Sequence, residues 1–451
     1  MVTRFLTPEE IGVYAFANIF YVTLRVVVSG AFIDTLVQKD ELDNSFLNTA
    51  FLCLICIFSV LFIFVFLIGI LLKFFFVMPN ISCVLVLLSL NFVFICLNII
   101  PESLFLKSLD FRKLAVKKLG EQFFGGFVGI VCAISGFGVF SLVAQVFAGN
   151  CAGFLYIQRF TNYKPRISFD YKLFLPTLFF FRNRAASYAL SGFSQRIDLF
   201  FVGSLLGPLY LGYYALASRI CAFVSVFTNL AFVRYAYPVF IANKNSIAKM
   251  RELYLFYAQC ATTLGAFGFF GLIFLSKPIV LLFFGQQWSA SIRILKLLSI
   301  AGLLTNSIFV PCILLRSIGK ANLEFRCILI PFVLNIIVLG KSTSLGLIFV
   351  ALTLISSLLI SLPFVFCYTH KETEIGLYEF IKPVFISWVC GFLSFTLSHI
   401  LLFFVLQYLN IGLSLQIVYG ICLYSLTFLF FLFVLNRKFI FRFFNSFLNY
   451  I

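Results

Sequence analysis

The stretch LTPEEIGVYAFA at residues 6–17 returns as LGPLYLGYYALA at residues 206–217. Six of the twelve positions match without a gap, and they include Pro, Gly and Tyr, which are less common in this chain than Leu. Internal repeats determine the architecture of a chain. In a membrane protein, a repeat of this kind predicts a transporter built from two related halves.

Both copies carry a helix-start signal. In the first copy, Thr7 can cap a helix that begins at Pro8, with Glu10 completing a capping box. In the second copy, Gly207 and Pro208 keep the turn but not the acidic residue. A helix-start signal alone could arise twice without duplication. Two further matches favour duplication: Gly12 with Gly212, and Tyr14 with Tyr214.

The composition predicts an all-α polytopic membrane protein. Hydrophobic residues make up 62% of the chain and charged residues 11%, whereas a soluble domain carries about 25% charged residues. The thirteen cysteines match no zinc or redox spacing. The two histidines are far apart, and the sequence contains no P-loop motif. We therefore expect no enzymatic activity, no bound metal and no cofactor.

Segments of about 20 apolar residues predict membrane helices. One further apolar piece, 278–284, is too short to cross and is expected to lie at the membrane surface or to dip into the membrane. Thirteen spans are predicted: 11–34, 47–72, 80–104, 119–135, 138–158, 174–203, 210–233, 252–275, 292–315, 327–340, 344–368, 383–404 and 411–435.

The basic residues alternate between successive connections. Of the 33 Lys and Arg residues, 22 fall in every second connection and in the C-terminal tail. Cytoplasmic loops carry such an excess, so the C-terminus is predicted to be cytoplasmic. The net charge of +17 then follows from membrane topology, and nucleic-acid binding is not expected. The opposite set of connections holds only Arg4, Lys73, Lys277 and Lys341.

Both the repeat and the charges predict one more helix before Met1. The second copy follows a long apolar stretch, 173–205, whereas five residues precede the first copy. With thirteen spans and a cytoplasmic C-terminus, Met1 would begin outside. Fourteen spans place both ends inside, so we expect a truncated chain or a start codon assigned too late.

Several charges remain inside the predicted spans, where ionisable residues usually face a cavity or a partner. Arg293 and Lys296 lie near a helix end, where their side chains can snorkel to the surface. The remaining arginines in the spans predict a cationic, water-filled cavity between the two halves, which suits an anionic substrate. The alternative is that Asp198 pairs with Arg196 or Arg219 as an internal ion pair. The predicted site comprises Arg25, Arg182, Arg184, Arg196, Asp198 and Arg219.

The same pattern predicts three regions. Residues 1–172 form an N-terminal helical bundle that lacks its first helix, and residues 173–370 form a C-terminal bundle. Residues 371–451 add two membrane helices and a cytoplasmic tail.

Ordered motifs over most of residues 4–288 resemble one family. They are RFLTPEEIGVYA (4–15), LVQKDELDNSFLNTAF (36–51), PESLFLKSLDFRKLA (101–115), GFGVFSLVAQVFAG (136–149), RIDLFFVGSLLGPLYLGYYALASRI (196–220) and FGQQW (284–288). The chain resembles the Wzx-type polysaccharide flippases, in particular the branch for colanic-acid-type and teichuronic-acid-type polymers. These flippases belong to the larger MOP group, which also holds multidrug exporters and lipid II flippases.

The resemblance implies two pseudo-symmetric, MATE-like helical bundles around a central cavity that opens alternately to each side. It implies an undecaprenyl-diphosphate-linked oligosaccharide as substrate, carried across the bacterial cytoplasmic membrane for O-antigen or exopolysaccharide synthesis. Membrane lipids and the polymerase and chain-length proteins of the same pathway are implied partners. Whether H⁺ or Na⁺ drives transport stays open. Sugar contacts are expected from Gln195, Ser191 and Asn183.

Two other functions remain open. A MATE-like multidrug or organic-ion antiporter would show buried carboxylates, and a membrane polymerase or ligase would show an essential acid or base in an outer loop. No predicted outer loop exceeds about twenty residues, which disfavours the second class.

Overall fold

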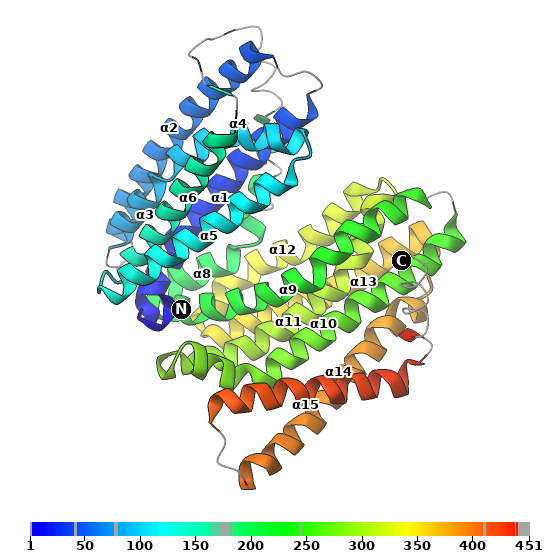
Figure 1. Cartoon of the computed structure of the whole chain (residues 1–451). Coiled ribbons are helices and arrows are strands. Elements are labelled where there is room, and N and C mark those ends of the chain that lie inside the picture. Colours follow the sequence, from blue (N-terminus) through cyan, green and yellow to red (C-terminus); the bar gives the residue numbers. More distant parts are fainter. Residues whose placement is uncertain are drawn as a thin grey trace. The chain divides into compact units, whose positions relative to one another are not determined.

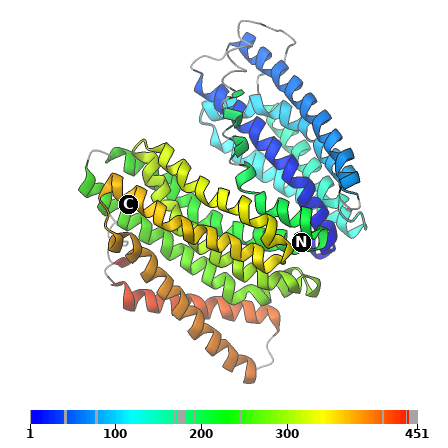
Figure 2. The same ribbon diagram turned by 180° about the vertical axis from the view of Figure 1, so that it is seen from behind.

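The computed structural model describes residues 2–39, 43–75, 80–161, 163–164, 166, 170, 181–182, 184–186, 188–190, 192–243, 246–408, 412–437 and 439–440. Every regular element within these ranges is a helix (Figures 1 and 2). Eleven helices among the described residues are long and apolar enough to cross a membrane. The prediction of an all-α membrane protein is confirmed.

The chain separates into two compact units, residues 1–215 and 216–451. The predicted division at 172 and 370 stays a prediction, but the observed division lies elsewhere. The first unit contains η1 (Val2–Arg4), α1 (Pro8–Gln38), α2 (Asn44–Phe75), α3 (Ile81–Ser89), α4 (Phe92–Lys107), α5 (Phe111–Ile134), α6 (Phe140–Phe160), α8 (Ile197–Leu206) and the start of α9 (Pro208–Ala242).

Helix α1 begins as its sequence predicts. The backbone N–H of Glu10 donates to Thr7 Oγ1 at 3.3 Å, and the Thr7 N–H donates to Glu10 Oε2 at 2.8 Å. This is a complete capping box with Pro8 in the first turn. At the start of α9, Gly207 adopts φ +86°, a conformation that favours glycine. Both helix starts in the repeat are therefore confirmed.

Small residues let α5 and α6 approach closely. A Cβ atom on Gly125 would lie 2.6 Å from the carbonyl oxygen of Gln145, and one on Gly149 would lie 2.7 Å from that of Glu121. Membrane helices pack in this way because lipid provides no hydrophobic force to drive them together. The α5–α6 pair forms one wall of the first unit.

Several predicted spans differ from the observed helices. Span 119–135 lies within α5, which starts eight positions earlier with a charged segment and is not among the eleven candidate spans. Span 80–104 is divided between α3 and α4. Part of span 174–203, namely residues 174–180, 183, 187 and 191, lies outside the described residues. The apolar piece 278–284 is continuous with the preceding span, because α10 (Ile247–Phe283) runs through Pro278 as one helix. Its expected place at the membrane surface stays a prediction.

The second unit is built around α10. Helices α11 (Ser289–Ser317), α14 (Leu377–Tyr408) and α15 (Leu413–Leu435) pack against it, and α13 (Leu347–Thr373) contacts both α11 and α12 (Ala321–Ser344). The 3-10 turn η2 (Gln286–Trp288) precedes α11. The last two helices therefore belong to the core of this unit, which includes the rings of Phe267, Phe274, Tyr424 and Phe428.

Candidate functional site: cations along the first helix

The two copies of the repeat touch each other within the first unit. A Cβ atom on Gly12 would lie 1.8 Å from the carbonyl oxygen of Pro208, and one on Gly212 would lie 1.9 Å from that of Pro8. Only glycine leaves room for such a contact. The starts of α1 and α9 thus cross at two glycines, with each glycine against the first residue of the other helix.

The described residues between 181 and 206 run antiparallel to α1 over most of its length. Phe32 packs on Phe181 with ring centroids 4.7 Å apart, and Phe16 stacks on Phe200 at 5.9 Å. Between these ends, Gly30 lies under the ring of Tyr188, and Gly192 lies beside the Thr23 methyl group. The predicted site residues on both segments are therefore brought onto one side of the first unit.

Arg25 lies near the middle of this contact. It is half-buried and is 17 residues from the start of α1, about 25 Å along the helix axis. Its guanidinium interacts electrostatically with the hydroxyl of Tyr21, one turn earlier. A cation at this depth is too far from either helix end to reach the headgroups easily.

A chain of hydrogen bonds holds Tyr21 in place. The Asn150 Nδ2 group donates to the Tyr21 hydroxyl at 3.3 Å and to Asn91 Oδ1 at 2.9 Å. Asn91 is fully buried, and its own Nδ2 donates to the Leu88 carbonyl oxygen at 3.1 Å. Residues from α6 and from the junction of α3 and α4 therefore fix the position of the Arg25 partner. Such polar networks make membrane packing specific.

The arginines opposite α1 differ in exposure. Arg182 is exposed, whereas Arg184 is half-buried and interacts electrostatically with Tyr188. The Tyr188 hydroxyl donates to Asp34 Oδ2 at 3.1 Å. Asn183 and Ser191, which were expected to contact sugar, lie outside the described residues, and Gln195 is exposed. Substrate binding by these residues stays a prediction.

Asp198 has a tyrosine partner. The Tyr214 hydroxyl donates to Asp198 Oδ2 at 2.5 Å, and Arg196 adds a favourable charge interaction. Tyr214 is completely buried and is one of the residues shared by the two copies of the repeat. Arg219 is exposed and belongs to the second unit. Within the first unit, Asp198 thus binds a tyrosine that the ion-pair alternative did not include.

Sequence reasoning missed one buried charge cluster. Lys117 was counted among cytoplasmic loop charges, but its side chain is only 9% exposed. It pairs with Glu102 on α4 and with Glu121 on α5, the latter at 2.9 Å. The signal that could have found this cluster is the i,i+4 spacing of Lys117 and Glu121. No cluster of metal-ligating side chains occurs among the described residues.

A family model described as "Polysaccharide biosynthesis protein" matches residues 1–293. The chain is similar to the succinoglycan biosynthesis transport protein ExoT of Rhizobium meliloti (strain 1021), with 24% identity over 72% of this chain and 66% of that protein. It is also similar to the teichuronic acid biosynthesis protein TuaB of Bacillus subtilis (strain 168), with 26% identity over 41% and 38%. The matches span less than two thirds of these relatives.

The fold has a close structural counterpart. The inward closed conformation of the lipid II flippase MurJ superposes with a TM-score of 0.77, covering 97% of this chain and 96% of that structure at 18% identity. This likeness confirms the predicted two-bundle fold, and the matched relatives agree with the predicted resemblance to Wzx-type proteins. Because the family model covers well over half of its length, the chain belongs to the polysaccharide biosynthesis protein family.

Proposed function

We propose that the protein is a flippase that moves polyprenyl-diphosphate-linked oligosaccharides across the bacterial cytoplasmic membrane by alternating access, for surface polysaccharide synthesis. Membership of the polysaccharide biosynthesis family and the flippase-like fold support this class of substrate. The observation that carries the proposal is Arg25, a half-buried cation near the middle of a membrane helix.

The chemistry of the substrate fits this cation. A diphosphate has a high negative charge, and a guanidinium group binds phosphate oxygens through paired donors while staying charged. The surroundings of Arg25 are drier than water, so the attraction is stronger there than at the surface. Tyr21 holds the guanidinium from one side. Arg184 and Arg196, which are also half-buried in the first unit, supply further positive charge along the path.

The proposal includes a topology and a set of partners. The distribution of Lys and Arg supports a cytoplasmic C-terminus. A C-terminal alkaline phosphatase fusion would then be inactive and a fluorescent-protein fusion bright, and the opposite pattern would contradict this topology. Polymerase and chain-length proteins that use the flipped substrate are the expected partners. Coupling to H⁺ or Na⁺ is a further part of the proposal.

The alternative function is a cation-coupled drug antiporter, which would use carboxylates within the spans. Asp34 and Asp198 each accept a hydrogen bond from a tyrosine, and Glu121 is paired with Lys117. Carboxylates that are engaged in this way are less available to bind a cationic drug. An antiporter would confer resistance to organic cations and would tolerate the loss of Arg25.

Complementation of a polysaccharide-flippase deletion strain tests the proposal. The chain is expressed as it stands and, in a second arm, with one apolar helix added before Met1. Recovery of surface polymer in either arm is expected, measured by polymer staining and by the disappearance of accumulated lipid-linked precursor. If both proteins insert at normal abundance and neither restores polymer, the flippase proposal fails.

A further inference from the structure

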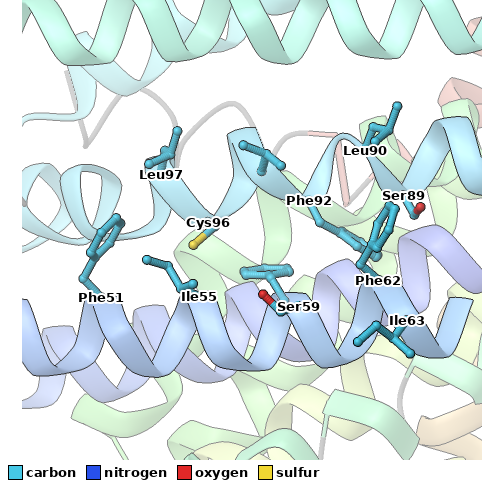
Figure 3. A pocket seen from close by; sticks show the side chains of 12 residues that line it. Phe51, Ile55, Ser59, Phe62, Ile63, Ser89, Leu90, Phe92, Cys96 and Leu97 are labelled. Atoms are coloured by element: carbon cyan, nitrogen blue, oxygen red, sulfur yellow. The ribbon is translucent and has the colours of Figure 1, made fainter. Parts of the chain in front are cut away.

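A groove opens between two membrane helices of the first unit. It has a volume of about 560 Å³ and is lined by α2 on one side and by the α3–α4 segment on the other. Phe58, Phe92 and Cys96 form its buried floor, whereas Ile55 and Val93 on its rims are 40% and 59% exposed. Figure 3 shows the α2 side chains rising toward α3–α4 and Cys96 pointing back toward α2.

The lining suits hydrocarbon. Its polar side chains are the two serines, Ser59 and Ser89, apart from the thiol of Cys96. The Ser89 hydroxyl already donates to the Val86 carbonyl oxygen at 2.6 Å. The most apolar window of α2 has a mean hydropathy of 3.3 and is largely unburied within this unit, which suits a groove whose open side faces lipid. A flexible apolar chain fills such a space without leaving a polar group unsatisfied.

The length of the groove distinguishes between kinds of lipid. From Phe51 to Ile63 the groove follows α2 for about 18 Å, at about 1.5 Å per residue. One leaflet of the hydrocarbon core is about 15 Å thick. The groove also lies near the middle of α2 rather than at one end. An acyl chain anchored in one leaflet ends near the midplane, whereas a long polyprenyl chain can follow the whole groove.

The groove lies next to the proposed head-group site. Phe92 on its floor stacks on Tyr21 with ring centroids 5.4 Å apart, and the Tyr21 hydroxyl interacts electrostatically with Arg25. One aromatic side chain therefore separates the groove floor from a mid-membrane cation. An amphiphile with an anionic head and a long apolar tail matches both features at once.

We propose that this groove holds the polyprenyl tail of the lipid-linked substrate while its diphosphate is bound at Arg25. The inference rests on the proposed function and adds a tail site to it. The groove is longer than one leaflet of the hydrocarbon core is thick. The tail can therefore stay in contact with α2 and the α3–α4 segment while the head group crosses the midplane. The tail then never has to leave the membrane.

Photo-crosslinking tests the site in the full-length protein reconstituted in vesicles. The probe is polyprenyl diphosphate with a diazirine in the tail, and the adducts are mapped by mass spectrometry. Adducts within 51–63 or 89–97 that disappear with excess unlabelled polyprenyl diphosphate are expected. A phosphatidylglycerol probe with a diazirine in its acyl chain should not show this competition. Adducts located elsewhere, or equal and uncompeted labelling by both probes, would overturn the tail site.

Two neighbouring substitutions separate the tail site from the flippase proposal. Ser59→Trp narrows the groove, whereas Val60, which is 65% exposed and does not line the groove, gives the control Val60→Trp. We expect Ser59→Trp to lower competed labelling and export by about tenfold, as a modest steric clash does, with no change for Val60→Trp. Unchanged labelling and export in Ser59→Trp would refute the groove alone. Competed labelling without complementation would refute the transport function alone.

Discussion

Lys117 and Glu121 form an ion pair of 2.9 Å on α5, in which the lysine side chain is 9% exposed and the glutamate side chain 12% exposed. Glu102 on α4 binds the same ammonium group. The space around Glu121 is also closed on the α6 side, because a Cβ atom on Gly153 would lie 2.3 Å from Glu121 Oε1. Three helices of the first unit therefore meet at one lysine.

Removing this lysine should destabilise the first unit. Lys117→Met leaves Glu102 and Glu121, whose side chains are 26% and 12% exposed, without their shared cation. Breaking a buried ion pair costs about 3–5 kcal/mol. Lower membrane abundance and a lower melting temperature in detergent are expected. Lys118, whose side chain is 63% exposed, provides the control Lys118→Met, which should behave like wild type. Equal stability of both variants would contradict a structural role for Lys117.

Arg25 should be needed for transport rather than for folding. Losing the hydrogen bonds of a charged group costs about 2 kcal/mol, so export in Arg25→Ala should fall at least about thirtyfold at normal abundance. Arg182→Ala should also abolish export, as its predicted role in the cavity requires.

Tyr21→Phe should have an intermediate effect on export, because the Arg25 guanidinium is kept but loses its partner. The control is Lys296→Ala, at an exposed position. Full export in Arg25→Ala would remove the basis for the anion site.

The hydrogen bond between Asp198 and Tyr214 should appear as an energetic coupling. Tyr214→Phe removes the donor at 2.5 Å, and an unsatisfied buried polar group costs about 1–3 kcal/mol. Asp198→Asn keeps an acceptor and should cost less. A double-mutant cycle on the free energy of unfolding should give a coupling energy of about 1 kcal/mol or more between the two side chains. Strictly additive effects would show that the two side chains do not stabilise each other.

The crossing of α1 and α9 should not tolerate a methyl group. Gly12→Ala and Gly212→Ala each place a Cβ atom within 2 Å of a backbone oxygen, and forced overpacking typically costs about 1–3 kcal/mol or more. Gly126 has no atom within 4 Å of its Cβ position, so Gly126→Ala should be neutral or stabilising by up to about 1 kcal/mol. Thermal unfolding of the three purified variants compares them. A stable Gly12→Ala variant would contradict the close crossing.

Local signals in the sequence predicted local structure well. Thr7, Pro8 and Glu10 define the start of α1 because a capping box depends only on residues within one turn. The membrane helices were predictable for a similar reason, since hydropathy sums over each segment independently. Even the tenth span, which Pro331 interrupts, is a continuous helix, α12. The backbone of a membrane helix satisfies its own hydrogen bonds, so length and apolarity largely decide it.

Contacts between distant segments were not predictable. Lys117 resembles a loop charge in the sequence, because its partner Glu102 lies on another helix and only packing brings the two together. The sequence around Asn150 also gives no sign of its hydrogen bond to Tyr21, because the two residues are 129 positions apart. For Asp198 the sequence suggested an arginine partner, and the structure adds a hydrogen bond from Tyr214 to the charge interaction with Arg196. Pairwise chemistry suggests which groups can pair, but tertiary packing selects the pair that forms.

The two copies of the repeat contact each other through a reciprocal pair of glycine–proline contacts. Pro8 lies against Gly212 and Pro208 lies against Gly12, which is the self-complementary pattern of a two-fold symmetric dimer interface. In a homodimer, one substitution alters both contacts at once. In this single chain, each contact can change separately, so duplicated segments are free to lose their symmetry one side at a time. That both sides still hold glycine against proline means that the fold meets the same steric demand twice.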